Sequence, residues 1–289
     1  MPHRVSIIAV LFVALLLLVQ GCATPSRLEA VPSQDTTRAE IPGIPNARYW
    51  VDSELEPFVR DAFASFRREQ AFLTRTGHRG TLTPVSFLAV SGGGDDGAFG
   101  AGLLVGWTET GTRPEFKAVT GISTGALIAP FAFLGPDYDD ELRTVYTTIG
   151  PPDVLKPRGL LAALTSDGMA DNRPLGELIS HHINADLLAR VAAEYDKGRL
   201  LLVATTNLDA RRPVIWNMGA IASSSDSRAL DLFRRIMLAS AAIPGAFPPT
   251  MIDVKRDGKP YQEMHVDGGA MAQVFLCPPG CSRLLAVSS

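Results

Sequence analysis

The sequence predicts an α/β fold: a single domain in which a mixed, mostly parallel sheet is sandwiched between helices, preceded by a signal peptide and a linker. From residue 83 onward, short apolar strands alternate with glycine-rich turns and helix-like segments. This alternation is typical of a parallel or mixed sheet with helices on its faces. The 289 residues are 46% hydrophobic and 20% charged, as in a globular protein long enough for a sizeable core. No internal repeat is visible, so the alternation is assigned to one domain.

The first residues predict a signal peptide. Arg4 provides a basic start, and residues 5–19 are apolar except for Ser6. A membrane-spanning helix needs about 20 apolar residues, whereas a run of this length suits the core of a signal peptide. The run leads into Gly21 and Cys22. This pair resembles the bacterial lipobox, a signal in which the cysteine is lipidated and becomes the new N-terminus.

The lipobox resemblance implies that residues 1–21 are removed and that Cys22 carries the lipid. Gln20 departs from the pattern, because a small residue is usual at that position. An uncleaved anchor and an ordinary signal peptide therefore stay open as alternatives. Ala23 in place of aspartate favours, by resemblance to bacterial sorting signals, the outer membrane facing the periplasm.

A tether and a domain follow the signal peptide. Residues 22–46 are polar and contain four prolines, which predicts a linker that separates the domain from the membrane. The domain is assigned to residues 47–289, with its core at 83–274. Its first element is a helix at about 54–74, where apolar residues recur at helical spacing: Leu55, Val59, Ala62, Phe63, Phe66 and Leu73.

The charge pattern restricts the partners of the protein. The net charge is −3 and the sequence has no basic run, which argues against nucleic acid as a partner. It also argues against electrostatic attraction to an anionic membrane. Membrane association is therefore expected through the N-terminal lipid or through apolar surface. The sequence does not indicate the oligomeric state.

Two further cysteines, Cys277 and Cys281, lie near the C-terminus. In an oxidising compartment they could form a disulfide. A metal site is less favoured, because no histidine or further cysteine accompanies the pair.

The elements of the core are assigned in order along the chain, each from its apolar pattern and its flanking turns. The predicted strands are 84–91, 116–121, 200–208, 212–219 and 263–269. The predicted helices are 98–110, 124–135, 173–182, 187–195 and 230–242.

Ser123 is the first candidate for chemistry. Gly121-Ile122-Ser123-Thr124-Gly125 fits the G-x-S-x-G pattern. In that pattern a serine lies on a sharp turn between a strand and a helix, and small neighbours let the backbone approach closely. A predicted strand precedes this motif and a predicted helix follows it, as the pattern requires. The alternative is a serine in a small-residue loop, since the pattern alone also occurs by chance.

A second glycine-rich turn, SGGGDDG at residues 91–97, lies between a predicted strand and a predicted helix. It lacks the lysine of a phosphate-binding P-loop, and the next strand does not end in the acidic residue of a dinucleotide site. Consecutive glycines can instead direct backbone N–H groups at an anion. Gly92, Gly93 and Gly94 are therefore candidates for an oxyanion hole beside Ser123. The alternative is that they only allow the helix to pack tightly on the strand.

A nucleophilic serine needs a base, and the histidines are poorly placed to supply one. An α/β-hydrolase triad has its histidine last in the chain, but no histidine follows a suitable acid near the C-terminus. His181 and His182 fall in a polar helical stretch. His265 alternates with Asp267 on a strand, so the two share a face. Asp267, at the strand end before two glycines, is the best candidate base, although an isolated aspartate there is more often a turn residue.

Together these motifs resemble the patatin-like phospholipase family over about residues 83–274. The glycine-rich loop, the G-x-S-x-G motif and Asp-Gly-Gly at 267–269 carry the resemblance, in that order. Two further stretches also resemble the family. They are ASAAIP at 239–244 with the following Phe-Pro-Pro, and TTNLD at 205–209 with the nearby Arg-Pro-Val-Ile-Trp.

The resemblance implies a patatin-like fold and a serine–aspartate dyad that hydrolyses acyl esters of lipids, as a phospholipase A or a lysophospholipase does. It implies no catalytic histidine, no metal and no cofactor. Ser123 would be the nucleophile, Asp267 the base, and Gly92, Gly93 and Gly94 the frame of the oxyanion hole. Two alternatives stay open: a general carboxylesterase or thioesterase, and an inactive lipoprotein that binds a lipid or a partner.

Two departures from the family pattern are visible. Many relatives carry Arg or Lys where this chain has Asp96, and an inward-pointing carboxylate would oppose charge development in an oxyanion hole. We expect Asp96 to point outward, where a carboxylate is favourable at a helix N-terminus. The chain also ends 20 residues after Gly269, whereas relatives usually continue through more helix. A truncated C-terminus therefore stays open.

Overall fold

The computed structural model describes residues 27–50, 52, 55–77, 85–148, 150–154, 156–157 and 168–276. The predicted signal peptide, the predicted lipidation site Cys22, and the pair Cys277 and Cys281 lie outside the described residues. Within the described part of the chain, no helix is both long and apolar enough to cross a membrane.

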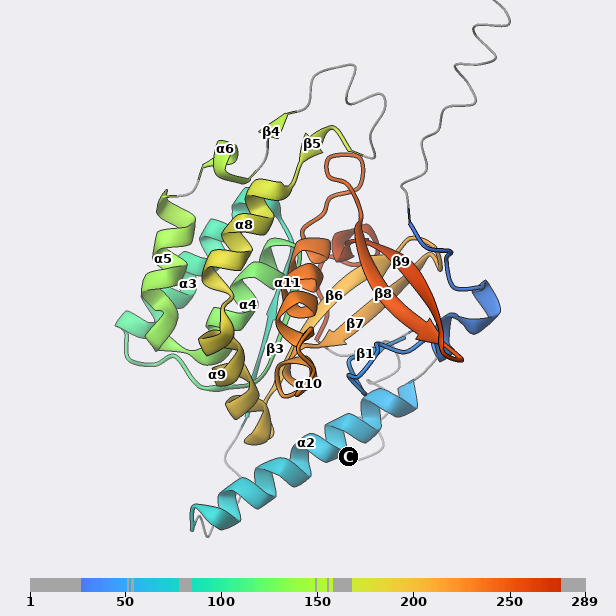
Figure 1. The fold of residues 1–289 in the computed structure, drawn as a ribbon. Coiled ribbons are helices and arrows are strands. Elements are labelled where there is room, and N and C mark those ends of the chain that lie inside the picture. Colours follow the sequence, from blue (N-terminus) through green and yellow to red (C-terminus); the bar gives the residue numbers. More distant parts are fainter. Residues whose placement is uncertain are drawn as a thin grey trace, which may run out of the picture.

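A seven-stranded sheet forms the centre of the molecule (Figure 1). Its main path runs in the order β1 (Arg48–Tyr49), β7 (Arg212–Asn217), β6 (Leu200–Asn207), β3 (Phe116–Ile122) and β2 (Ser86–Val90). A hairpin of β8 (Thr250–Arg256) and β9 (Lys259–Asp267) joins this path through β6. A separate two-stranded sheet pairs β4 (Lys156–Pro157) with β5 (Ala170–Asp171).

The sheet is mixed, as predicted, but the prediction that it is mostly parallel is wrong. Among the pairs of this sheet, β2–β3 and β3–β6 are parallel, whereas β6–β7, β6–β9, β1–β7 and β8–β9 are antiparallel. The reason is the length of the connections, because a parallel pair needs a crossover of a dozen or more residues. Four residues join β6 to β7, and two join β8 to β9. Those two, Asp257 and Gly258, both have positive φ, which suits a tight hairpin turn.

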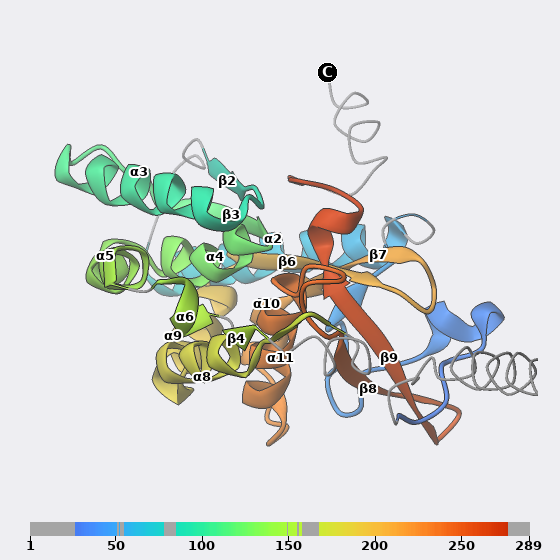
Figure 2. The same ribbon diagram turned by 90° about the horizontal axis from the view of Figure 1, so that it is seen from above.

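Helices lie against the sheet and enclose the core. One face packs against α4, α9, α10 and α11, and Figure 2 shows α8, α9 and α11 on that side. The larger apolar core fills this layer and includes Val119, Phe133, Val203, Trp216 and Phe233. The α-helices of the described residues are α2 (Leu55–Arg75), α3 (Gly97–Glu109), α4 (Thr124–Leu134), α5 (Asp139–Thr148), α6 (Pro151–Val154), α8 (Arg173–His182), α9 (Ala185–Asp196), α10 (Met218–Ala222) and α11 (Ala229–Ser240). The 3₁₀-helices are η1 (Ser33–Arg38), η2 (Gly94–Asp96), η3 (Pro136–Tyr138) and η4 (Gly268–Ala270).

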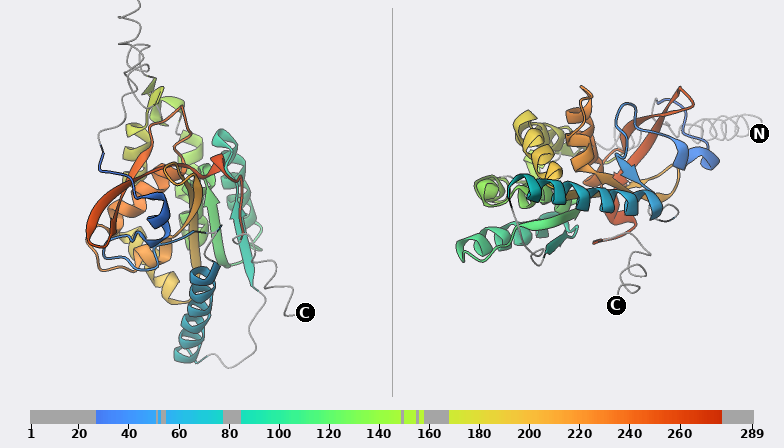
Figure 3. Two further views of the ribbon diagram at one scale, coloured as in Figure 1. Left: turned by 90° about the vertical axis from the view of Figure 1, so that its right-hand side faces the viewer. Right: turned by 90° about the horizontal axis from the view of Figure 1, so that it is seen from below.

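Helix α2 confirms the predicted helix near 54–74 but presents a different face to the domain. It runs across the lower end of the sheet (Figure 3), and Phe58 joins a smaller apolar cluster on the second face. Phe63 and Phe66 of the predicted stripe are 64% and 46% exposed. Polar contacts decide the orientation: Asp61 accepts hydrogen bonds from Tyr49, Tyr195 and Asn217 at 2.8–3.2 Å.

Residues 27–46, assigned to the tether from sequence, pack against the β8–β9 hairpin in the structure. Val31, Ile41 and Ile44 are buried in the main core, and Glu40 forms a backbone bridge with Lys255. Apolar side chains spaced through an otherwise polar segment explain this packing, because each removes apolar surface from water. The folded body therefore includes this part of the predicted tether.

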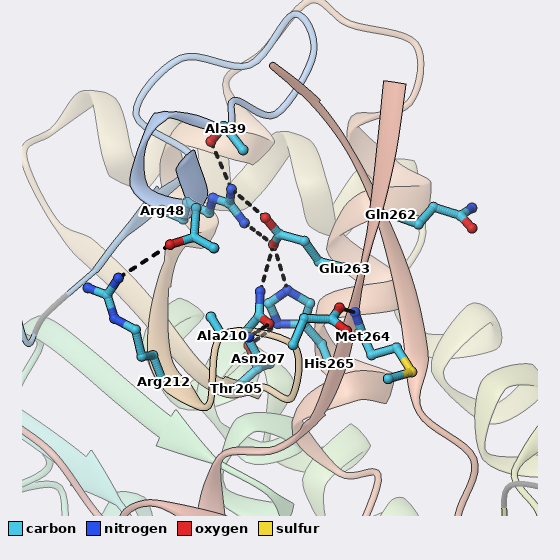
Figure 4. A network of polar contacts seen from close by, with 12 residues as sticks. Ala39, Arg48, Thr205, Asn207, Ala210, Arg212, Gln262, Glu263, Met264 and His265 are labelled. Atoms are coloured by element: carbon cyan, nitrogen blue, oxygen red, sulfur yellow. Dashed lines mark hydrogen bonds and ion pairs between the residues drawn. The ribbon is translucent and has the colours of Figure 1, made fainter. Parts of the chain in front are cut away.

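A buried ion pair ties β1 to β9 (Figure 4). Nη1 and Nη2 of Arg48 both donate to the carboxylate of Glu263, and Asn207 Nδ2 donates to the same carboxylate at 3.0 Å. Burial opposes the charge on Glu263, but the Arg48 charge and the hydrogen bonds from His265 and Arg48 outweigh it. Together they lower the pKa of Glu263 to about 2. The negative charge is thus stabilised in the folded state.

We predict that this pair makes stability depend on pH between about 5 and 2. In the unfolded chain Glu263 titrates near 4.5, so its stabilisation is complete above that pH and is lost as pH falls toward the folded value. Glu263→Gln should destabilise the protein by about 3–5 kcal/mol at pH 7, because Arg48 is left buried without a counter-charge. Urea unfolding of both proteins at pH 7 and pH 3 measures the difference. The difference should shrink at pH 3, and an unchanged difference would contradict the assignment.

Candidate active site

The ends of β3 and β9 meet along one edge of β6. Strand β3 runs parallel to β6 and ends with Ile122 opposite Ala204. Strand β9 runs antiparallel to β6 and ends with Asp267 opposite Thr205, the next residue of β6. The two strands therefore approach the same point from opposite directions. Ser123, directly after Ile122, reaches Asp267 there, and its hydroxyl donates to Asp267 Oδ2 at 2.6 Å.

Ser123 occupies a strained turn between β3 and α4. Its φ is 56° and its ψ is −126°, a backbone conformation that is costly for a residue with a side chain. Its N–H donates to Ser240 Oγ at 3.0 Å, and Ser240 Oγ donates to the carbonyl of Ala204 at 2.7 Å. Ser240, the last residue of α11, therefore holds the turn on β6. Ser240 lies in the stretch 239–244 that resembles the family in sequence, but its role depends on contacts with distant residues and could not be predicted from that pattern.

The glycines beside Ser123 are required by close backbone contacts. A Cβ on Gly121 would lie 2.4 Å from the carbonyl oxygen of Gly125, and one on Gly125 would lie 2.3 Å from that of Val90. No side chain fits at such distances from backbone atoms. The strand, turn and helix predicted around the G-x-S-x-G motif are thus present, with β3 packed directly on the start of α4.

Asp267 is buried, and hydrogen bonds fix both its backbone and its carboxylate. Its backbone N–H donates to the carbonyl of Ala242 at 2.9 Å. Its Oδ1 accepts the N–H of Gly269 at 2.7 Å, while Oδ2 faces Ser123. Burial raises the pKa of Asp267, and the hydrogen bonds from Ser123 and Gly269 only partly oppose that rise. A raised pKa makes the carboxylate a stronger proton acceptor.

The glycine-rich loop borders Ser123, as predicted, but its three glycines differ. A Cβ on Gly92 would lie 3.1 Å from that of Ser123, yet the N–H of Gly92 donates to the carbonyl of Gln273 at 2.9 Å. Within the described residues, no acceptor pairs with the N–H groups of Gly93 and Gly94. Gly93 and Gly94 thus keep free N–H donors, whereas Gly92 lets the loop pass close to Ser123.

None of the described histidines, His181, His182 and His265, forms a hydrogen bond with Ser123 or Asp267. His181 is exposed on α8, and His182 packs its ring against Phe131 with 6.4 Å between centroids. His265 is fully buried and contacts Thr205 Oγ1 at 2.9 Å and Glu263 Oε2 at 3.1 Å. Burial lowers the pKa of His265, which favours the neutral ring. The described residues also contain no group of three or more His, Cys, Asp or Glu side chains that could hold a metal ion.

The geometry of this site agrees with a family assignment made from sequence. Residues 88–276, well over half of the chain, match the sequence profile of the patatin-like phospholipases. The chain belongs to the patatin-like phospholipase family. Members of this family are typically hydrolases that act on lipid esters.

The structure is similar to VipD from Legionella pneumophila, with 16% sequence identity and a TM-score of 0.43. The similarity covers 69% of this chain and 48% of VipD, so this chain spans about half the length of that protein. A comparison with curated proteins gives no match.

Asp96 lies near the end of the glycine-rich loop, and the sequence predicts that it points outward. It is exposed, as expected, and precedes the first residue of α3. Its carboxylate makes no capping hydrogen bond to that helix. A Cβ on Gly93 would lie 3.3 Å from the Cβ of Asp96, so the side chain of Asp96 lies close to Gly93.

We predict that Gly125→Ala abolishes the active fold of the site, because its new methyl would collide with backbone oxygen atoms of Val90 and Ser91. The control is Gly102→Ala on α3, where nothing lies within 4 Å of the added Cβ. That control should stabilise the protein by about 0.5–1 kcal/mol, since alanine is the better helix former. Thermal unfolding and labelling of Ser123 by a fluorophosphonate measure both effects. Normal stability and labelling of Gly125→Ala would refute the close approach.

Proposed function

We propose that this patatin-like protein hydrolyses acyl esters of lipids or phospholipids with Ser123 as nucleophile and Asp267 as base. The observation that carries the proposal is the 2.6 Å hydrogen bond from Ser123 Oγ to Asp267 Oδ2. It joins a hydroxyl on a strained strand–helix turn to a buried carboxylate of raised pKa. A nucleophile within hydrogen-bond reach of its base is the arrangement that covalent acyl transfer needs.

The proposed reaction has two halves. Ser123 Oγ attacks the ester carbonyl while Asp267 takes its proton, and the free N–H groups of Gly93 and Gly94 bind the oxyanion. The intermediate expels the alcohol, which receives the proton from Asp267, and the acyl group stays on Ser123. Water then attacks the acyl-enzyme and passes a proton to Asp267. Breakdown releases the fatty acid and returns that proton to Ser123.

Exposed apolar side chains on the segments around the dyad favour a lipid over a small soluble ester. Phe99, 77% exposed, follows the glycine-rich loop, and Met271 follows η4. Ile243 follows Ala242, which holds Asp267, and Met169 is exposed on a segment bonded to Gly245. Apolar surface around a site suits contact with lipid assemblies. A carboxylesterase or thioesterase remains the second enzymatic candidate, and a lipid-binding lipoprotein without activity the non-enzymatic one.

We predict that Ser123→Ala and Asp267→Asn each lower turnover of a phospholipid by roughly three orders of magnitude or more. The double variant should be hardly slower than either single variant, because the two groups act as one unit. The matched control is His181→Ala with His182→Ala, which should keep activity, as should treatment with a chelator. Initial rates on phospholipid vesicles and on a soluble short-chain ester measure these effects and separate phospholipase from esterase. Near-normal turnover of Asp267→Asn would show that the base lies elsewhere.

We further propose that the protein is anchored to the bacterial outer membrane, facing the periplasm, through a lipid on Cys22. The apolar run at residues 5–19 and Gly21 before the cysteine support this proposal. Radiolabelled palmitate should be incorporated into the wild-type chain in cells and not into Cys22→Ala. Equal labelling of the two proteins would refute lipidation at this position.

A further inference from the structure

Thr205 lies where the two strands that carry the dyad meet. It is the register partner of Asp267. Its neighbour Ala204 is the register partner of Ile122, which precedes Ser123. Ala204 and Thr205 are thus the two residues of β6 at this junction, and of the two only Thr205 has a polar side chain. Thr205 is fully buried, and the dyad as proposed does not use its hydroxyl.

The contact of β9 with β6 is short. Three pairs form it: Thr205 with Asp267, Thr206 with Val266, and Asn207 with His265. Because side chains alternate along a strand, a slip of one residue would turn Asp267 to the other face of the sheet. Ser123 would then lose its proposed base. Three backbone pairs are a weak constraint for that task, so the register needs further support from side chains.

Side chains supply that support through a buried chain of hydrogen bonds, and Figure 4 shows its members Thr205, His265 and Glu263. Trp216 Nε1–H donates to Thr205 Oγ1 at 2.7 Å, and Thr205 Oγ1 lies 2.9 Å from His265 Nδ1. His265 Nε2 lies 3.1 Å from the ionised Glu263. One tautomer fits all three contacts: Nε2–H donates to Glu263, and Nδ1 accepts the proton of Thr205.

Two cross-strand contacts of the same offset connect β6 to β9. Thr205 bonds to His265, two residues before its register partner Asp267. Asn207 bonds to Glu263, two residues before its own partner His265. Both bonds require the same register, so they reinforce one another. This diagonal arrangement also leaves the Asp267 carboxylate free to face Ser123.

We propose that Thr205 is a positioning residue of the active site. Its hydroxyl accepts a hydrogen bond from Trp216 and donates one to His265, and these bonds fix the register of β9 that aligns Asp267 with Ser123. The inference rests on the proposed function. It assigns no chemistry to His265, which acts as an acceptor. The positioning effect passes through Asp267 alone, because the hydrogen bonds of the Thr205 hydroxyl go to His265 and Trp216 and not to Ser123.

The test compares three variants of nearly equal shape. Thr205→Val removes the hydroxyl, and kcat should fall about tenfold to a hundredfold with little change in KM, as expected for a misplaced reacting group. Thr205→Ser keeps the hydroxyl and should recover most of the loss. Thr206→Val is the matched control, because Thr206 Oγ1 is buried without a partner in the described residues. It should behave as wild type in activity and stability.

A double-mutant cycle separates positioning from a general loss of structure. In an Asp267→Asn background, Thr205→Val should cause no further loss of the residual rate, because the group it positions is already gone. An equal loss in both backgrounds would overturn the proposal, as would full activity of Thr205→Val. The proposed dyad would survive either result so long as Ser123→Ala and Asp267→Asn remain inactive.

If Thr205→Val does not fold, Trp216→Phe provides the second variant. It removes the indole N–H that orients the Thr205 hydroxyl and leaves the bond to His265 in place. We expect a severalfold loss of kcat in folded protein, again absent in the Asp267→Asn background. Unchanged kcat of a folded Trp216→Phe would contradict the role of the hydrogen-bond chain.

Discussion

The edge of β6 that faces β3 is shared by two strands, and the arrangement of the site depends on this division. Residues 200–204 pair with β3, and residues 205–207 pair with β9. Because one strand is parallel to β6 and the other antiparallel, their C-terminal ends point at each other. A nucleophile that follows one strand and a base that ends the other are thereby brought into hydrogen-bond contact. The end of helix α11 and the residues after it complete the junction, since Ser240 Oγ accepts the backbone N–H of Ser123 and the carbonyl of Ala242 accepts that of Asp267.

Burial gives this junction its chemical character. It raises the pKa of Asp267, which costs stability at neutral pH but strengthens the base. Nearby, Glu263 keeps its charge because Arg48 is its partner. Glu263 and Asp267 are thus two buried carboxylates whose pKa values are shifted in opposite directions. One is held ionised by a permanent counter-charge, and the other has only neutral hydrogen-bond donors. That difference separates a carboxylate that fixes structure from one suited to proton transfer.

Much of the site could be predicted from sequence because it is encoded locally. The glycines around Ser123, the strand before it and the helix after it lie within a few residues, and Asp267 is marked by two following glycines. The buried face of α2 could not be predicted from its apolar stripe, because hydrogen bonds from distant residues to Asp61 decide it. The packing of residues 27–46 depends likewise on β8 and β9. The Thr205–His265–Glu263 contacts cross strands, but one signal was visible: Glu263, His265 and Asp267 place three polar side chains on one face of a strand.

The central claim is that Asp267 alone activates Ser123, and the pH dependence of Ser123 labelling tests it most directly. The rate of reaction with a fluorophosphonate should be measured from acid to neutral pH in wild type and in Asp267→Asn. Burial raises the pKa of Asp267, so the wild-type rate should fall with a single ionisation as pH drops through that raised value. Asp267→Asn should react slowly, with no such ionisation. An acid limb of the same shape that persists in Asp267→Asn would contradict the account, because another group would then be the base.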